Sequence, residues 1–271
     1  MNDRKRCYSI IVVTYNNADG LRRTLESIRQ LDYPDKEVVV VDGGSSDGSL
    51  QIIAHYQDII SMSVSEPDNG IYNAMNKGIK LVNGDYVAFM NAGDVFANER
   101  VLALVSRYDG DILLGEDIYG GKRRRINDHL TLYDLLSTGI RHQAVYYRRE
   151  VLQKYGFDES YKLIADLKSV VEPFVKDQIV ITSVNEPLAV CESGGLSKQR
   201  WRDTLIEDRR LISEVVDPLY RDDYQKFARI NNSMVYDFIL LSYFPKVFLL
   251  IRLMAKIVRF LNDKFKHIPV N

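Results

Sequence analysis

The sequence predicts an α/β domain with a mostly parallel sheet flanked by helices, followed by a helical C-terminal extension. Through residue 110, short β-branched runs alternate with segments that have helical spacing of apolar residues. That alternation is typical of a parallel sheet with helices on both faces. After residue 201 the sequence becomes mostly helical in pattern. We therefore expect one domain over residues 1–200 and a helical extension over residues 201–271.

The first two strands are the clearest elements. Ile10–Val13 and Val38–Val41 are continuous β-branched runs, which is the pattern of strands buried on both faces. A helix is expected between them, because apolar residues recur there at spacings of four, three and three, at Leu21, Leu25, Ile28 and Leu31.

The remaining elements follow from the same patterns. We expect further strands at residues 59–64, 86–90, 112–114, 144–147, 180–181 and 188–190. We expect further helices at residues 50–56, 71–82, 130–136 and 163–175. The basic segment Lys122–Arg125 is expected to be a solvated loop, and the alternative is contact with anionic phosphates.

Polar and acidic residues follow three of the expected strands. They are Thr14-Tyr15-Asn16, Asp42 and Asn91-Ala92-Gly93-Asp94. Loops are polar in any case, but ligands bind beyond the carboxyl ends of strands in open α/β sheets. A carboxylate such as Asp94, in a tight glycine turn, is a suitable ligand for Mn²⁺ or Mg²⁺. Such an ion neutralises a diphosphate leaving group.

Composition excludes several classes of protein. The 36 basic and 37 acidic residues give a net charge of −1, so no global basic field indicates nucleic acid as a partner. Two cysteines, Cys7 and Cys191, cannot form a disulfide framework. No stretch of 18 residues is free of charge, and no signal-peptide pattern follows Met1. We therefore expect a cytoplasmic protein without a simple transmembrane span.

Four ordered segments resemble family 2 glycosyltransferases, which have the GT-A fold, a Rossmann-like sheet. The segments are Ser9–Asn17, Val39–Ser49, Glu66–Ile79 and Gly84–Asp94. The resemblance extends over roughly residues 8–200. Four segments in the family's order are a more specific signal than any one of them.

The resemblance implies a nucleotide site. Thr14, Tyr15 and Asn16 match the segment that lines the family's nucleotide pocket. Asp42 matches the carboxylate that accepts a hydrogen bond from the base, usually uracil. Asp68 matches a further acidic position of the nucleotide site.

The resemblance also implies a metal site for Mn²⁺ or Mg²⁺. Asp94 matches the metal-contacting, last aspartate of the family's Asp-x-Asp motif, whereas Asn91 occupies the first acidic position. Two further positions depart from the family pattern. Asn73 stands where aspartate is commoner, and Lys168 stands where another acid is expected.

The catalytic base is assigned through the same resemblance. Residues 157–166 resemble the segment that ends in the base of an inverting transfer, so Asp166 is expected to deprotonate the acceptor hydroxyl. Without the family, Asp166 is simply an acid favoured by the dipole of a first helical turn. His142 and Gln143 are candidate acceptor or phosphate contacts, although a lone histidine is commonly structural. Residues 193–197 resemble a late loop of the family.

The C-terminal segment has a separate pattern. Lys246–His267 contains six basic residues against the single acid Asp263, with a wide apolar face. A basic amphipathic helix of this kind indicates in-plane binding to a membrane surface. The alternatives are docking on the catalytic domain and pairing with a second copy in a homodimer.

The resemblance implies an inverting hexosyltransferase. It would move a sugar from a nucleoside-diphosphate sugar, a UDP-sugar by resemblance, to a lipid-linked or polysaccharide acceptor. The resemblance also implies a role in cell-envelope or capsule synthesis, which we expect at the inner face of the plasma membrane. Two alternatives remain open: a nucleotidyltransferase, and a non-catalytic domain that binds sugar nucleotide or acts as a scaffold in a membrane complex.

Overall fold

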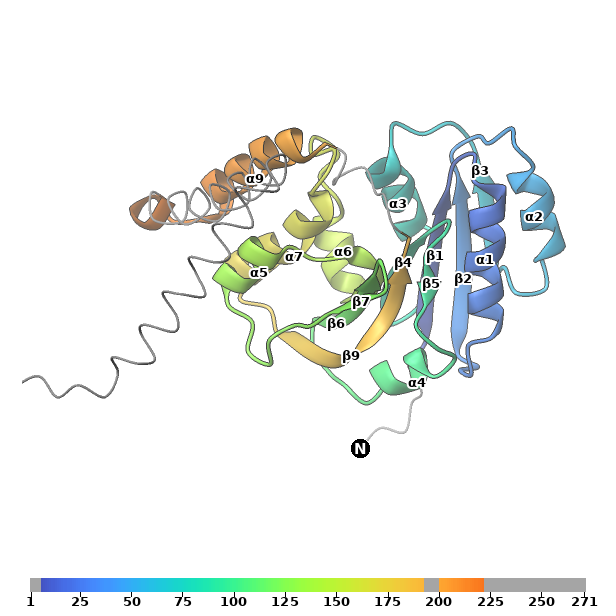
Figure 1. Cartoon of the computed structure of the whole chain (residues 1–271), viewed down its shortest axis with the longest axis horizontal. Helices are drawn as coiled ribbons and strands as arrows, with labels where there is room; N and C mark the ends of the chain where they lie inside the picture. Colours follow the sequence, from blue (N-terminus) through green and yellow to red (C-terminus); the bar gives the residue numbers. More distant parts are fainter. Residues whose placement is uncertain (1–5, 193–199, 222–271) are drawn as a thin grey trace, which may run out of the picture. The chain divides into compact units, whose positions relative to one another are not determined.

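A parallel half-sheet forms the first part of the fold. The computed structural model describes residues 6–192 and 200–221. Four parallel strands lie in the order β3 (Met62–Ser65), β2 (Lys36–Asp42), β1 (Tyr8–Thr14) and β4 (Tyr86–Asn91) (Figure 1). Thr14 is the register partner of Asp42, and Val13 is the partner of Asn91. The polar strand ends therefore meet at one edge, as the sequence predicts.

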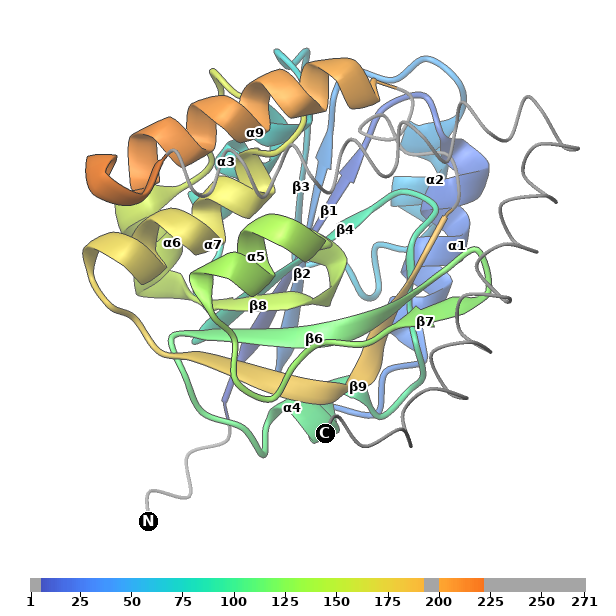
Figure 2. The same ribbon diagram turned by 60° about the vertical axis from the view of Figure 1, so that its left-hand side comes forward.

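The second half of the sheet is mixed. Beyond β4 the order continues through β8 (Val145–Arg148), β6 (Ile112–Tyr119), β9 (Ile181–Cys191) and β5 (Val95–Phe96), with β7 (Lys122–Arg124) paired to β6. β8 is antiparallel to both of its neighbours, whereas β9 is parallel to β6. The predicted α/β class with flanking helices is confirmed, and much of the parallel pairing lies in the first half. β9 is one long strand that bends across the sheet (Figure 2), where the sequence indicates two short ones.

One helical layer packs on the face that carries Ile10 and Val12. It consists of α1 (Ala18–Arg29), α2 (Ser49–His55) and α4 (Val101–Val105). The predicted apolar positions of α1 are buried: Leu21, Leu25 and Ile28 are fully inaccessible to solvent. Burial of such side chains contributes roughly 1.5–3 kcal/mol each.

A second layer covers the opposite face, where Ile11 and Phe89 point. It contains α3 (Ile71–Ile79), α6 (Arg149–Tyr155) and α7 (Ala165–Lys176). A Cβ atom on Gly78 would lie 2.5 Å from Ile11 Cγ2, so glycine lets α3 approach β1 closely. The ring of Phe157 packs edge-on against Phe89, with centroids 5.1 Å apart.

The last described elements belong to the same compact unit. α5 (Leu132–Thr138), the 3₁₀ turn η1 (His142–Ala144) and α9 (Trp201–Val215) all lie within a unit that ends at Asp217. α9 thus packs with the α/β part of the chain, whereas the sequence places it in the extension. The predicted segments 193–197 and 246–267 lie outside the described residues. Within the described ranges, no helix is long and apolar enough to cross a membrane.

Candidate active site

A cavity of about 830 Å³ lies beyond the carboxyl ends of β1 and β4. Eight stretches of the described chain contribute lining residues: 13–15 and Asn17 at the end of β1, 68–74 at the start of α3, 91–94 at the end of β4, Tyr119 of β6, 136–143, 162–167, 191–192 at the end of β9, and Thr204 and Asp208 of α9. The cavity therefore joins the ends of the parallel strands to loops and helices from the second half of the chain.

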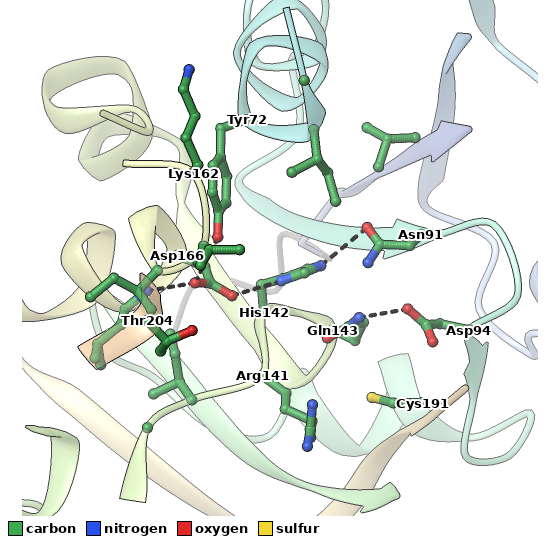
Figure 3. A pocket seen from close by; sticks show the side chains of 18 of the residues that line it. Tyr72, Asn91, Asp94, Arg141, His142, Gln143, Lys162, Asp166, Cys191 and Thr204 are labelled. Carbon is green, nitrogen blue, oxygen red and sulfur yellow. Dashed lines mark hydrogen bonds and ion pairs between the residues drawn. The ribbon is translucent and has the colours of Figure 1, made fainter. Parts of the chain in front are cut away.

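Asp166 lies in the wall of this cavity, in the first turn of α7 (Figure 3). Its Oδ2 lies 2.9 Å from Nδ1 of His142. Its Oδ1 accepts hydrogen bonds from the Tyr72 hydroxyl at 3.1 Å and from the Leu167 N–H at 3.0 Å. The carboxylate is thus fixed by residues from α3, η1 and α7 while it remains beside the cavity.

Tyr72 donates a hydrogen bond to Asp166, the predicted base. Burial, and then the negative charge of Asp166, raise the pKa of Tyr72 well above its ordinary value. The phenol therefore keeps its proton at physiological pH. A donor in this position stabilises the ionised form of Asp166, which is the form that a general base needs.

His142 connects Asp166 to the end of β4. Its Nε2 lies 3.2 Å from Oδ1 of Asn91, while Nδ1 faces Asp166. The ring is buried and lines the cavity, with a protein partner at each nitrogen. This geometry orients the Asp166 carboxylate, and the ring is also close enough to the cavity to meet a substrate.

The loop that precedes Asp166 is held by α9. The carboxylate of Glu207 accepts three backbone hydrogen bonds, from the N–H groups of Lys162 at 2.7 Å, Leu163 at 2.9 Å and Ile164 at 3.1 Å. These three N–H groups lie just before the first turn of α7. Backbone donors at the start of a helix have no partner within the helix. Glu207 thus fixes the backbone of the loop that leads into α7 and Asp166.

Asp94 is buried at the opposite side of the cavity. Its Oδ2 accepts a hydrogen bond from Nε2 of Gln143 at 2.5 Å, and its Oδ1 accepts one from the N–H of Glu192 at 2.8 Å. Burial raises the pKa of the Asp94 carboxyl, and the hydrogen bonds oppose that effect. A cation beside Asp94 would compensate the charge that burial disfavours.

The donor set around Asp94 fits a metal shared with substrate. Among the described residues, no group of three His, Cys, Asp or Glu side chains is arranged to hold a metal ion. Mg²⁺ and similar ions at phosphate sites commonly bind one or two carboxylates, and substrate phosphates and water complete the shell. The single carboxylate of Asp94 matches that arrangement.

The predicted nucleotide-site residues divide into two sets. Thr14, Tyr15 and Asp68 line the cavity, whereas Asn16 and Asp42 do not. Tyr15 is 65% exposed and presents an open ring face. A Cβ atom on residue 43 would lie 2.5 Å from Asp68 Oδ2, so Gly43 lets the loop after β2 lie against Asp68.

Asp42 is fully buried behind that loop. Its Oδ2 accepts hydrogen bonds from the Ser65 hydroxyl at 2.6 Å and from the Ser45 and Gly44 N–H groups at 2.9 and 3.2 Å. Its Oδ1 accepts one from the Ser45 hydroxyl at 2.5 Å. Asn16, at φ 48°, accepts a hydrogen bond from the N–H of Ser46 and so joins the first loop to the second.

Comparison with known proteins identifies the family. The model for glycosyl transferase family 2 matches residues 9–165. A PGL/p-HBAD biosynthesis glycosyltransferase of Mycobacterium tuberculosis is 31% identical over 201 residues, which cover 70% of this chain and 78% of the relative. The chain belongs to glycosyl transferase family 2. It is therefore a glycosyltransferase, and the predicted family and enzyme class are confirmed.

Solved structures share the fold of this chain. TarS of S. aureus in complex with UDP-GlcNAc aligns with a TM-score of 0.63 at 20% identity, over 80% of this chain and 70% of TarS. The mannosyltransferase PcManGT of Pyrobaculum calidifontis, in complex with GDP-Man and Mn²⁺, aligns with a TM-score of 0.65 at 17% identity, over 84% and 70%. At these identities the likeness establishes the GT-A fold.

Asn73 and Lys168, which depart from the family 2 pattern, both contact acidic side chains. Asn73 donates a hydrogen bond to Glu159 at 3.0 Å. The ammonium of Lys168 lies 2.8 Å from Asp158 and 2.6 Å from Glu214. Burial alone would lower the pKa of Lys168, but both carboxylates outweigh it and raise that pKa. Lys168 therefore connects α7 to α9 by ion pairs.

The predicted solvated loop at Lys122–Arg125 is wrong for residues 122–124, which form a strand. Lys122–Arg124 is the strand β7, and Arg123 pairs with Glu116, which is buried. Arg124 lies 2.5 Å from the fully buried Asp117. The basic run thus compensates buried acids of β6, a pairing that depends on the β6–β7 hairpin.

Four residues of the site were missed by sequence reasoning: Tyr72, Arg141, Glu207 and Asp208. Tyr72 lies within a segment that resembles the family, and Arg141 directly precedes His142, so their positions were visible but their roles were not. Glu207 and Asp208 lie on a helix that reads as part of an extension. No local signal marks them, because their contacts depend on how α9 packs.

Proposed function

We propose that this glycosyltransferase moves a hexosyl group from a UDP-sugar to an acceptor hydroxyl, with inversion at the anomeric carbon. The observation that carries the proposal is Asp166, whose carboxylate lines the cavity and is oriented by Tyr72 and His142. A fixed, hydrogen-bonded carboxylate beside a substrate cavity is the arrangement that a general base requires. The family membership supports the same role.

Asp166 is the base in this mechanism. The acceptor oxygen attacks the anomeric carbon while Asp166 takes the hydroxyl proton. The bond between the anomeric carbon and the diphosphate oxygen breaks, and the nucleoside diphosphate leaves with the bonding electrons. Tyr72 and the Leu167 N–H keep one carboxylate oxygen occupied. The other oxygen, beside His142, is then oriented to receive the proton.

Asp94 would hold Mn²⁺ or Mg²⁺ at the diphosphate. When bound, such an ion neutralises the charge that develops on the leaving group. Gln143 and the Glu192 N–H hold the Asp94 carboxylate in place. Their contacts support a role for Gln143 as a positioning residue for Asp94.

The nucleotide would occupy the end of the cavity near β1. Thr14 and Asp68 line that end, and the exposed ring of Tyr15 offers a face on which a base can stack. Asp42 would bind the base only after the Ser45 loop yields one of its hydrogen bonds. Asn16 supports this region by holding the two loops together.

The acceptor is proposed to be lipid-linked or a polysaccharide in envelope synthesis. The PGL/p-HBAD biosynthesis role belongs to the mycobacterial relative, and it supports a similar assignment here. The basic, apolar pattern of residues 246–267 supports work at the inner face of the plasma membrane, where a lipid-linked acceptor would be found.

Release of nucleoside diphosphate from a panel of nucleotide-sugars tests the proposal. The wild type is compared with Asp166→Asn and Asp94→Ala, with Mn²⁺ or EDTA and mixed membrane lipid extract as acceptor. Asp58→Asn is the matched control, because Asp58 is an exposed carboxylate paired with Arg29. Metal-dependent release from one donor, lost in both site variants and kept in the control, supports the proposal.

The same assay separates the alternatives. Release of pyrophosphate instead of nucleoside diphosphate would indicate a nucleotidyltransferase. Turnover that survives Asp166→Asn would contradict the assignment of the base. Tight nucleotide-sugar binding with no turnover, for any acceptor in the extract, would favour the binding-only alternative.

A further inference from the structure

Arg141 lines the cavity immediately before His142 (Figure 3). Its Nε lies 3.1 Å from Oδ2 of Asp117, and its guanidinium carbon lies 4.1 Å from the centroid of the Tyr119 ring. One edge and one face of the guanidinium are therefore held by β6. The side chain is 34% exposed, so the rest of the group remains accessible from the cavity.

The charge of Arg141 is not fully compensated by Asp117. That carboxylate is fully buried and is also paired with Arg124 at 2.5 Å. Arg124 is fixed further by donating a hydrogen bond to the Gly139 carbonyl at 2.8 Å. Two guanidinium groups thus share one carboxylate, so Asp117 alone does not neutralise both of them.

Arg141 lies on the side of the cavity that carries Asp94. Gln143, two residues after Arg141, donates to the Asp94 carboxylate. Cys191, at the end of β9, lines the same cavity as Arg141 and Asp94.

Arg141 differs from the other charged groups that line the cavity. Among the described lining residues, Lys162 is the other lysine or arginine, and its ammonium donates to the Glu159 carbonyl at 2.7 Å. Within the described part of the chain, the cavity is also lined by five carboxylates whose charge would repel a diphosphate without a cation: Asp68, Asp94, Asp166, Glu192 and Asp208.

We propose that Arg141 binds the diphosphate of the nucleotide-sugar and stabilises it as the leaving group. A guanidinium presents a planar fork of donors that matches two phosphate oxygens. The diphosphate gains negative charge when its bond to the anomeric carbon breaks, and the charge of Arg141 offsets that gain. Since Asn91 replaces an acid near Asp94, Arg141 would share the neutralisation with the metal. This inference rests on the proposed function.

Equilibrium binding of UDP and uridine, with GDP and guanosine in parallel, tests the proposal. The full chain is measured as wild type, Arg141→Met, Arg141→Lys and Arg125→Met, each with Mn²⁺ and with EDTA. Arg125 is an exposed arginine near the same hairpin that does not line the cavity. Arg124 still pairs with Asp117 in the Arg141 variants, so a thermal melt should show that they remain folded.

We expect Arg141→Met to weaken nucleoside diphosphate binding about 10- to 100-fold and to leave nucleoside binding unchanged. Arg141→Lys should recover part of the loss, and Arg125→Met should match the wild type. Equal diphosphate affinity in Arg141→Met and wild type overturns the inference while the proposed function stands. If Arg141→Met raises only the KM for an acceptor that bears a phosphate, the inference is overturned too. Arg141 would then bind the phosphate of the acceptor and not that of the donor. Failure of the wild type to bind any nucleotide overturns both.

Discussion

Asp42 and Asp166 are held in contrasting ways. Asp42 accepts its hydrogen bonds from its own loop and from Ser65 on the adjacent strand, so its surroundings are built locally. Asp166 is held by Tyr72 and His142, which lie 94 and 24 residues away in the sequence. The predicted nucleotide-site residue Asp42 is thus positioned by its own loop and the adjacent strand, whereas the predicted base Asp166 depends on packing between distant elements. Substitutions far from the chemistry should therefore affect catalysis more than donor binding.

The sharpest test of this contrast is Asp166→Asn. Loss of the general base should lower kcat by about 10²–10⁴-fold, because an amide cannot take the acceptor proton. Nucleotide binding should stay at the wild-type level, since the nucleotide side is built without Asp166. Rate measurements and equilibrium binding on the same preparation check both parts. A parallel loss of nucleotide affinity would contradict the separation of the two sides.

Asp94→Asn should give the next largest effect, on the donor side. We expect Mn²⁺-dependent binding of nucleoside diphosphate to weaken about 10- to 100-fold, because the metal loses its carboxylate ligand. Binding measured in EDTA should be nearly unchanged. Titration with Mn²⁺ at fixed nucleotide measures the effect. Unaltered metal dependence would remove Asp94 from the metal site.

Glu207→Gln tests whether α9 controls the base from a distance. A neutral amide with one oxygen cannot hold three backbone N–H groups as the carboxylate does. We expect kcat to fall about tenfold, with the KM for the donor unchanged. Asp203→Asn on the same helix, where Asp203 pairs with Arg200, is the matched control. A change in donor KM with kcat preserved would indicate a different role.

Lys168→Met should reduce stability and leave the donor side intact. Removing the ammonium leaves Asp158 and Glu214 without their shared cation, and we expect a loss of about 1–2 kcal/mol, since both acids are partly exposed.

The pH dependence of that variant provides its control. Burial opposes ionisation of Asp158, but hydrogen bonds from Lys168 and Ser160 outweigh it and lower the pKa of Asp158 to about 2. The wild type should therefore hold this stabilisation above about pH 4 and lose it as the pH falls toward about 2. Denaturant unfolding at several pH values measures this effect. If the free energy of unfolding falls equally with pH in the wild type and in Lys168→Met, the Lys168–Asp158 pair does not provide the stabilisation.

Asp208→Asn should produce the smallest change. Burial, and then the charge of Glu207, raise the pKa of the Asp208 carboxyl to about 6. Because its ionisation is disfavoured in the folded state, wild-type stability should decrease as the pH rises from about 4 to 6. The variant lacks this penalty and should be more stable by about 1 kcal/mol above pH 6. Thermal melts at pH 4.5 and 7.5 measure it, and a difference that grows toward low pH would contradict the sign.

Sequence reasoning succeeded where local pattern determines the structure. β-branched runs specify β1 and β2, and parallel pairing then brings Thr14, Asp42 and Asn91 to one edge. Family resemblance directed attention to Asp94 and Asp166, and the structure brings both to one cavity. The roles of these residues stay predictions.

Sequence reasoning missed what depends on distant contacts. Arg124 reads as part of a solvated run, yet it pairs with a buried acid because β7 folds back on β6. Glu207 reads as one charge on an amphipathic helix, and only the packing of α9 brings it to the amides before α7. Charge complementarity across a fold has no fixed spacing in the sequence, so pattern alone cannot reveal it.

The three amides bound by Glu207 also provide a local hydrogen-exchange probe. Their protons can exchange with solvent only when the hydrogen bonds to the Glu207 carboxylate break. The exchange rates of Lys162, Leu163 and Ile164 therefore measure how often α9 separates from the loop before Asp166. If an acceptor is captured between α9 and that loop, these three amides should slow together when it binds. Hydrogen exchange would then report the arrival of the second substrate without any turnover.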